Sequence, residues 1–331
     1  MSAVQSEEPV VSAAFSNLTA VARARSAEPE GPARVRPQVP LRTAVVLGTG
    51  LVGTSVALAL TAAGVRVHLE DTDQAAAVLA QSRGAGTAGP PAAPADLAVV
   101  AVPPAAVGRV VREAQRRGTA RHFVDVASVK AVPVADVAAR GCDTSRFIGG
   151  HPMAGGERSG PGAARADLFH GRPWVLTPLP ETRGDTLNAA LDLVTVCGAT
   201  PVMMQPADHD RAVALVSHAP HVVSSLLAAR LEHAPSGALR LSGRGVGDMT
   251  RIAGADPALW ADILGSNADA VADVLDGLAE DLGRTVAALR ALASADTSAR
   301  AGARQLTDVL RRGRAGRARI DEVPTGTTRT G

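Results

Sequence analysis

The feature that most constrains the fold is a glycine-rich hexapeptide, Gly48-Thr49-Gly50-Leu51-Val52-Gly53, with the spacing G-x-G-x-x-G. An apolar, β-branched run precedes it at 43–47, and an apolar stretch of helical period follows it at 51–63. In such a context the first glycine permits a tight turn, the second lets a pyrophosphate approach the backbone, and the third lets the helix pack closely on the strand. The hexapeptide therefore predicts a dinucleotide site at a helix N-terminus. A plain glycine-rich turn is the alternative.

Acidic residues follow the next expected strand, 65–69, about 20 residues beyond the hexapeptide, where dinucleotide-binding folds carry a ribose-binding carboxylate. We choose Asp71 for this role, with Glu70 as the near alternative. Because no arginine follows directly to accept a 2′-phosphate, the sequence favours NAD over NADP. The third expected strand ends at Val102-Pro103, which we place beside the cofactor, although the proline there is also explained as punctuation of the chain.

The order of elements predicts two domains. Strands and helices alternate over 41–205, which indicates an α/β Rossmann-type domain with a doubly wound sheet. From Pro206 the period is helical, so we expect an all-α dimerisation and substrate domain over 206–294. An apolar stripe along 269–292 suits packing against another helix or a second subunit. We expect residues 1–40 to be a disordered leader and 295–331 a flexible tail rich in Arg and Gly.

Composition excludes several classes of protein. Lys and Arg total 34 against 32 Asp and Glu, and no basic segment carries aromatic residues to stack on bases, so we expect no nucleic-acid partner. Two cysteines, Cys142 and Cys197, are too few for a disulfide framework and fit the cytoplasm. We find no apolar signal-peptide core and no later run long enough to span a bilayer, so we expect no membrane association.

A histidine pair raises the question of a metal site. His218 and His221 have the spacing of a ligand pair on a helix, but Pro220 lies between them and no adjacent Cys or carboxylate set completes a site. We therefore expect no bound metal.

Several further segments are more specific than the hexapeptide. In the first half of the chain they are Asp125-Val-Ala-Ser128-Val-Lys130, Gly149-Gly-His151-Pro-Met-Ala-Gly-Gly-Glu157, Asp167-Leu-Phe169 and Trp174-Val-Leu-Thr-Pro178. In the second half they are Asp208-His-Asp-Arg-Ala212, Ser217-His218-Ala-Pro-His221, Asp248-Met-Thr-Arg251-Ile-Ala253, and Trp260 after Asp256-Pro257. Over about residues 43–293 the chain resembles the prephenate dehydrogenase family. The resemblance implies a homodimer that uses NAD to oxidise a cyclohexadienol carboxylate, with loss of CO2, on the route to tyrosine.

The resemblance and the chemistry point to three catalytic candidates. Oxidation of a ring alcohol calls for a neutral imidazole that accepts or polarises the hydroxyl proton, and His151 is the candidate. Ser128 would hydrogen-bond the same hydroxyl or orient His151, while Lys130 would help by its charge. For Ser128 taken alone, a helix cap explains the residue as well.

Five residues are candidates for binding substrate. Two substrate carboxylates call for a planar bidentate cation, which indicates Arg251, as the family position implies. His218 would contact the substrate, and His221 would be a second polar wall or a packed residue. Glu157 resembles a family position that gates or shapes the pocket through ion pairs, with a plain surface carboxylate as the alternative. Trp260 would close the pocket from the partner subunit or would belong to the core or an interface.

Other functions remain open at this point. Arogenate, with an amine in its side chain, and a 4-amino-4-deoxy analogue used in antibiotic pathways fit the same residues as prephenate. Another hydroxyacid or imine dehydrogenase would have no reason to carry the His151 and Arg251 segments, and a non-catalytic NAD sensor would need neither. The chain after Ser294 is too short and polar for the ACT-like domain of some relatives, so we expect no separate allosteric site for tyrosine.

Overall fold

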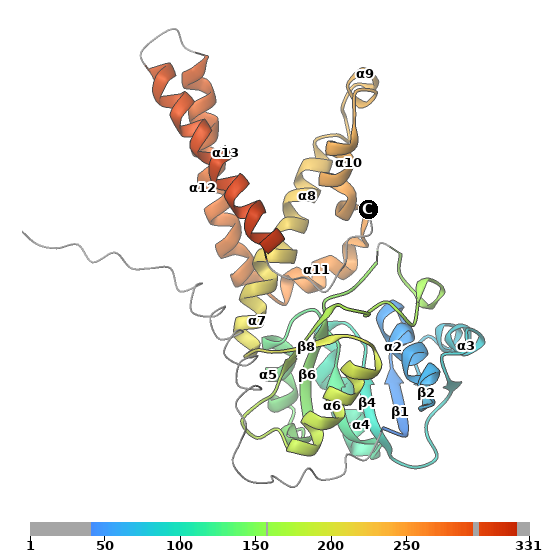
Figure 1. The fold of residues 1–331 in the computed structure, drawn as a ribbon. Helices are drawn as coiled ribbons and strands as arrows, with labels where there is room; N and C mark the ends of the chain where they lie inside the picture. Colours follow the sequence, from blue (N-terminus) through green and yellow to red (C-terminus); the bar gives the residue numbers. More distant parts are fainter. Residues whose placement is uncertain (1–40, 157, 294–297, 323–331) are drawn as a thin grey trace, which may run out of the picture. The chain divides into compact units, whose positions relative to one another are not determined.

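The computed structural model describes residues 41–156, 158–293 and 298–322 (Figure 1). The expected disordered leader at 1–40 lies outside the described residues, and so does Glu157. The same holds for the two ends of the expected tail, 295–297 and 323–331.

An eight-stranded sheet occupies the first part of the described chain, in the order β3-β2-β1-β4-β5-β6-β7-β8. All neighbouring strands are parallel except β6 and β7. The carboxyl ends of the parallel strands therefore share one edge, where such sheets bind ligands. The strands are β1 (Thr43–Leu47), β2 (Arg66–Glu70), β3 (Thr87–Ala88), β4 (Ala95–Val100), β5 (Ala120–Asp125), β6 (Phe147–Pro152), β7 (Pro173–Thr177) and β8 (Thr200–Met203).

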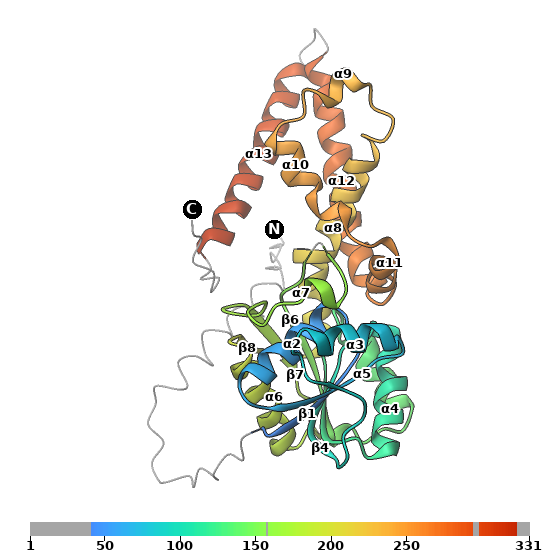
Figure 2. The same cartoon turned by 90° about the vertical axis from the view of Figure 1, so that its right-hand side faces the viewer.

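Helices cover both faces of the sheet (Figures 1 and 2). On one face, α2 (Leu51–Ala62) and α6 (Gly184–Val196) share an apolar core with the strands. On the other, α4 (Val107–Arg117) and α5 (Ala131–Ala139) form a second core. Because both faces are covered, successive residues of β1 and β4 are apolar and buried, as parallel sheets require. The predicted doubly wound Rossmann-type fold is confirmed. The remaining elements are α3 (Gln74–Ser82) and the short helices η1 (Pro104–Ala106), η2 (Thr144–Arg146) and η3 (Pro161–Ala163).

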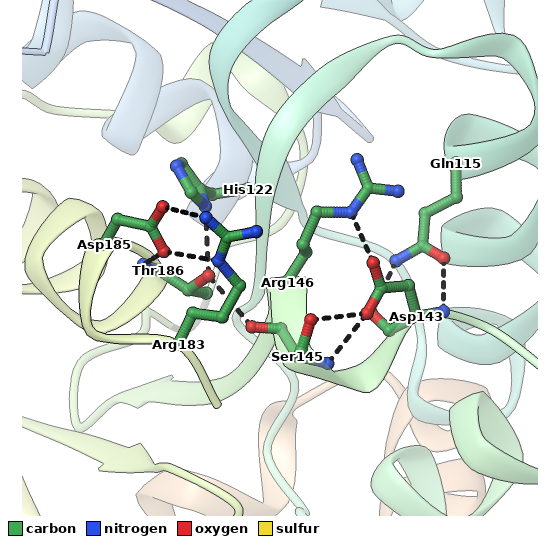
Figure 3. Close-up of polar contacts among 8 residues, drawn as sticks. All are labelled: Gln115, His122, Asp143, Ser145, Arg146, Arg183, Asp185 and Thr186. Atoms are coloured by element: carbon green, nitrogen blue, oxygen red, sulfur yellow. Dashed lines mark hydrogen bonds and ion pairs between the residues drawn. The ribbon is translucent and has the colours of Figure 1, made fainter. Parts of the chain in front are cut away.

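A polar network fixes the amino ends of β5 and β6 (Figure 3). Asp143 caps η2 by accepting from the backbone N–H of Ser145 at 3.1 Å and from Arg146 at 2.8 Å. Thr186 of α6 donates to the Ser145 carbonyl at 3.0 Å and contacts His122 of β5 at 3.0 Å. These contacts set where β6 begins, and therefore which of its residues arrives at the opposite, carboxyl edge.

The chain is helical from Pro206 onward, which confirms the predicted helical second domain. α7 continues through a π-helical segment, η4, into α8 without a break. Single π-turns inside helices are often found at functional sites. The elements are α7 (Pro206–Val213), η4 (Ala214–His218), α8 (Ala219–Ala229), α9 (Ser236–Leu239), α10 (Arg244–Thr250), η5 (Arg251–Gly254), α11 (Pro257–Gly265), α12 (Ala268–Leu292) and α13 (Ser298–Glu322).

The predicted flexible tail was wrong over Ser298–Glu322, which forms the helix α13. This helix packs antiparallel to α12, since Gly302 lies against Ala288 while Arg312, further along α13, pairs with Asp281 at 3.1 Å. The composition did not distinguish the two structures, because a run rich in arginine is typical of a solvated tail, yet Ala and Arg are also among the best helix formers.

The expectation that no run is long enough to span a bilayer was also wrong, because one helix has the length and the apolar composition to do so. The helical run from Pro206 to Ala229 has a mean hydropathy of 1.5 over an 18-residue window. Core helices of soluble proteins can be equally long and apolar, and this run carries the buried polar residues His209, Asp210 and His218. Apolar side chains such as Leu226, which is 62% exposed, account for its hydropathy.

Candidate active site

The glycine-rich turn between β1 and α2 has the geometry of a dinucleotide site. Gly48 has a φ of +102°, and a Cβ there would lie 2.2 Å from the Ala101 carbonyl oxygen. A Cβ on Gly53 would lie 2.0 Å from the Gly48 carbonyl oxygen, so only glycine lets α2 pack this closely on the turn. By contrast, a Cβ on Gly50 would meet nothing within 4 Å, which leaves open space beside the backbone for a ligand. The three glycines thus do the three separate tasks that the spacing predicts.

The N-terminus of α2 faces this open space. No side chain of the described chain caps it at Gly50. The first N–H groups of the helix, from Leu51 onward, are therefore suited to a phosphate, and the helix dipole favours the same charge.

Asp71 is bound to the glycine-rich turn rather than pointing away from it. Its carboxylate accepts from the Thr49 backbone N–H at 2.6 Å and from the Thr49 hydroxyl at 2.8 Å. Partial burial works to raise the pKa of Asp71, but these bonds and one from the Asp73 backbone outweigh it, and the pKa is lowered. The Thr49 N–H is thus already used by Asp71. The alternative, Glu70, instead pairs with Arg117 of α4 at 2.9 Å, which favours Asp71 for the ribose.

Val102 and Pro103 follow β4, next to the same turn. A Cβ on Gly48 would lie 3.2 Å from a Val102 methyl group, so Val102 forms one wall of the turn. Pro103 is exposed and precedes η1, which begins at Pro104.

His151 lies near the carboxyl end of β6, half-buried. Close packing places it there, because a Cβ on the preceding Gly150 would lie 2.6 Å from the Asp125 carbonyl oxygen at the end of β5. Burial lowers the pKa of His151 well below its usual value, and the nearby His209, Lys130 and His218 lower it further. His151 is therefore a neutral imidazole at neutral pH, as a base must be.

Lys130 is fully buried beneath this histidine. Its ammonium pairs with Asp125 and donates to the Gly150 carbonyl oxygen at 2.6 Å. Burial lowers the pKa of Lys130 and raises that of Asp125, while their ion pair opposes both shifts. Lys130 thus acts on His151 through charge and through the backbone of β6. Ser128 lies half-buried in the same loop, between β5 and α5.

A cavity of about 800 Å³ joins the dinucleotide turn to the helical domain. Leu51 at the start of α2 and the glycines Gly155 and Gly156 after β6 line one side. Arg83, directly after α3, supports the adjoining loop by donating to the carbonyl oxygens of Gly162 at 2.9 Å and Ala164 at 2.8 Å. The helical domain supplies the other side with His221, Arg251, Ile252, Ala255 and Trp260.

The aromatic wall of the cavity is made within one chain. Trp260 stacks on His221 with ring centroids 3.5 Å apart and an interplanar angle of 7°. Trp260 also approaches His218 edge-on, at 6.1 Å between centroids. His221 is therefore a packed residue that also lines the cavity. Trp260 therefore lines the cavity of its own chain. Its expected role in closing the pocket of the partner subunit stays a prediction.

His218 is buried in the π-helical segment rather than facing the cavity. Its Nδ1 lies 3.1 Å from the amide nitrogen of Asn267, which also donates to the Asp210 carbonyl oxygen at 2.8 Å. Because the amide nitrogen donates, Nδ1 accepts and the His218 proton is on Nε2. Burial lowers the pKa of His218 to about 4, so the ring is neutral.

Three residues for which no role was predicted lie at the site: His209, Asp210 and Asn267. His209 lies 2.8 Å from His151, and Asp210 lies 2.7 Å from His209. The adjacent pair His209-Asp210 was a usable signal, since a carboxylate beside a histidine often orients its ring. Among the described residues, no three His, Cys, Asp or Glu side chains are grouped as a metal site requires.

The fold and the site define a two-domain dehydrogenase. The first domain is of the Rossmann type, with a complete dinucleotide turn and a neutral, half-buried imidazole, and the second is helical and bears an arginine. Two family models match the chain: the nucleotide-binding domain of prephenate dehydrogenase over residues 56–203 and its dimerization domain over 205–300. The chain belongs to the prephenate dehydrogenase family.

Individual relatives agree. A probable prephenate dehydrogenase, NovF, from Streptomyces niveus is 45% identical over 85% of this chain and 78% of its own. A cyclohexadienyl dehydrogenase from Zymomonas mobilis is 31% identical over 72% and 85%. Among solved structures, a putative prephenate dehydrogenase from Corynebacterium glutamicum is 28% identical, with a TM-score of 0.72 over 85% and 90%. A prephenate dehydrogenase from A. aeolicus, solved with hydroxyphenyl propionate and NAD+, has the same fold at 24% identity and a TM-score of 0.73, over 85% and 99%.

Proposed function

We propose that the chain is an NAD-dependent prephenate dehydrogenase, which converts prephenate to 4-hydroxyphenylpyruvate and CO2. The observation that carries the proposal is the neutral imidazole of His151, half-buried at the carboxyl edge of a sheet that also holds a dinucleotide turn. Family membership supplies the substrate class. Bound NAD would supply the hydride acceptor for the ring carbon that carries the hydroxyl group.

The residues of the chain divide the remaining work. The N–H groups at the start of α2 bind the pyrophosphate, and Asp71 binds the ribose hydroxyls. Arg251 holds a substrate carboxylate with its planar fork, on the cavity wall opposite Leu51. His221 forms the polar side of the substrate pocket, Trp260 closes it, and Glu157 gates it. His218, expected from the sequence to contact the substrate, is buried and packs edge-on against Trp260.

His151 moves one proton and returns it. As the ring carbon loses its hydride, the hydroxyl proton passes to the imidazole and the ring becomes a dienone. The bond between the ring and its carboxylate then breaks, its electron pair enters the ring, and CO2 leaves. The phenolate oxygen takes the proton back from His151, so no net proton is released. Ser128 would bond the same oxygen, and the positive charge of Lys130 disfavours protonation of His151 before substrate arrives.

We further propose that the enzyme works as a homodimer in the cytoplasm. The family's dimerization domain supports the assembly. Cys142 and the buried Cys197 are free thiols, which agrees with a reducing compartment.

Steady-state kinetics with prephenate, arogenate and 4-amino-4-deoxyprephenate tests the substrate. We expect the highest kcat/KM with prephenate. A higher kcat/KM with either amine-bearing compound would replace prephenate by that compound and leave the residue roles unchanged.

The cofactor is tested by comparing NAD with NADP. We expect a strong preference for NAD, because the Asp71 carboxylate would face the 2′-phosphate of NADP. Comparable kcat/KM with NADP would contradict the role of Asp71.

A further inference from the structure

A chain of three polar side chains extends from His151 into the protein. His151 Nδ1 lies 2.8 Å from His209 Nε2, and His209 Nδ1 lies 2.7 Å from Asp210 Oδ1. The two imidazoles meet edge to face, with centroids 5.0 Å apart and an interplanar angle of 74°. His209 is fully buried, so it cannot itself contact a substrate in the cavity.

Asp210 is held as a hydrogen-bond acceptor. Its Oδ1 accepts from the Lys130 backbone N–H and its Oδ2 from the Ala131 backbone N–H, each at 2.8 Å. These two residues begin α5, where the helix dipole favours a negative charge. An ionised carboxylate has no proton to donate, so the third contact, with His209 Nδ1, must have the histidine as the donor.

This requirement determines which ring nitrogens of His209 and His151 carry protons. With its proton on Nδ1, a neutral His209 presents the lone pair of Nε2 to His151. His151 must then donate from Nδ1, and the lone pair of its own Nε2 is left free. The opposite arrangement would set two lone pairs against each other at 2.7 Å, between His209 Nδ1 and Asp210.

We infer that His209 and Asp210 are positioning residues that hold His151 in the tautomer with a basic Nε2. The inference deepens the proposed function and rests on it for the chemical step alone. When Nε2 accepts the substrate proton, His151 carries N–H groups on both nitrogens. Its Nδ1–H continues to donate to His209 Nε2, and His209 Nδ1–H donates to the Asp210 carboxylate. The negative charge of Asp210 thereby stabilises the new positive charge on His151.

Asp210 also acts on the second histidine of the site. Its carbonyl oxygen holds the Asn267 amide in the orientation that donates to His218 Nδ1. The free ring nitrogen of His151 is thus an acceptor and that of His218 a donor, and both states depend on the position of one residue.

The direct test is imidazole nitrogen NMR on the full chain labelled at histidine, with the His151 signals assigned by their loss in His151→Asn. We expect a protonated Nδ1 and an unprotonated Nε2 on His151. A protonated Nε2 would overturn the inference, because it would mean that His209 is an imidazolium donating on both sides. This readout needs no turnover, so it stands even if prephenate proves not to be the substrate.

Variants supply the second test. In Asp210→Asn the negative charge behind His209 is lost, so the imidazolium that forms on His151 is no longer stabilised by it, and we expect kcat to fall by roughly 100- to 10,000-fold with KM nearly unchanged. The matched control is Asp208→Asn, two residues earlier on the same helix, where the carboxylate is exposed and pairs with Arg211. We expect it to leave kcat unaltered. Wild-type kcat in Asp210→Asn would overturn the inference.

A conservative variant separates positioning from packing. Gln at 209 can donate to Asp210 and accept from His151, whereas Leu fills similar space and can do neither. We expect His209→Gln to retain a higher kcat than His209→Leu and to keep the acidic limb of the wild-type pH profile. Equal kcat in the two variants at equal thermal stability would contradict the positioning role.

Discussion

At the scale of single residues, the environment of His151 decides what the residue can do. An exposed imidazole would be partly protonated near neutral pH. Here burial, followed by the nearby His209 and Lys130, lowers the pKa of His151 well below that range. The imidazole is therefore neutral at neutral pH, which is the state that the proposed role as a base needs.

Replacing the base should affect turnover and not binding. In His151→Asn the side chain stays polar but cannot accept a proton, so we expect kcat to fall by roughly 100- to 10,000-fold with KM nearly unchanged. Wild-type activity should decline only as the pH falls toward the lowered pKa of His151, because only then is the base protonated. That acidic limb should disappear in His151→Asn. His122→Asn, in the network of Figure 3, is the matched control and should keep kcat. Normal kcat in His151→Asn would refute the assignment.

Replacing the anchor should affect binding and not turnover. Arg251→Ala leaves a substrate carboxylate without its planar partner, at a cost of roughly 2–5 kcal/mol that should appear mainly in KM. Arg251→Lys keeps the charge without the fork and should give an intermediate KM. The affinity for NAD, measured by calorimetry, should be unchanged in both variants. An unaltered KM in Arg251→Ala would exclude this residue as the anchor.

Single residues were predictable where their role is local in sequence. The glycine-rich turn follows from spacing alone, since Gly48 and Gly53 lie where a Cβ would clash with the backbone and Gly50 lies beside open space. Asn267 could not be inferred, because its partner His218 lies 49 residues away and no local pattern joins them. For His209 the adjacent Asp210 was a usable signal, but its contact with His151, 58 residues away, follows no local pattern. The use of the Thr49 N–H by Asp71 likewise depends on how β2 meets β1.

At the scale of elements, periodicity predicted most strands and helices but not their limits. Strands and helices alternate over most of the chain up to β8, and central strands such as β1 and β4 are apolar runs because they are buried on both faces. The antiparallel β7 and the π-turn at Ala214–His218 leave no comparable signal. α13 was missed because its arginines indicate solvent exposure and helix equally well.

The packing of α13 on α12 can be tested with two glycines of one helix. Gly302 is buried, and a Cβ there would lie 2.6 Å from the Ala288 carbonyl oxygen, whereas a Cβ on Gly313 would meet nothing within 4 Å. We expect Gly302→Ala to lower the free energy of unfolding by about 1–3 kcal/mol through overpacking. Gly313→Ala should raise it by up to about 1 kcal/mol through helix propensity. Urea unfolding at fixed protein concentration measures both, and equal shifts of the same sign would contradict the packing.

At the scale of the whole molecule, the helical domain leaves much apolar surface uncovered. The stripe predicted along α12 is largely open to solvent in a single chain, as at Leu282, which is 65% exposed. On α8 the side chain of Leu226 is 62% exposed. Apolar surface on this scale is typical of a protein interface, and the family's dimerization domain covers both helices.

We therefore expect light scattering at micromolar concentration to give twice the mass of one chain. Leu282→Glu should shift the population toward monomers by placing a charge in the interface. Leu79→Glu, on the exposed side of α3 in the nucleotide-binding domain, is the matched control and should remain dimeric. A monomeric wild-type chain would contradict this assembly.

We propose that one site oxidises a ring alcohol and then releases CO2 from the resulting dienone, with one CO2 for each hydride transferred. The most direct test of this central claim is to incubate the full chain with prephenate and NAD, and to measure the NADH formed, by absorbance, against the CO2 trapped from the same reaction. We predict equal amounts of the two products throughout the time course, and neither above background in His151→Asn. NADH formed without CO2, or no NADH from prephenate, arogenate or the 4-amino-4-deoxy analogue, would contradict the account.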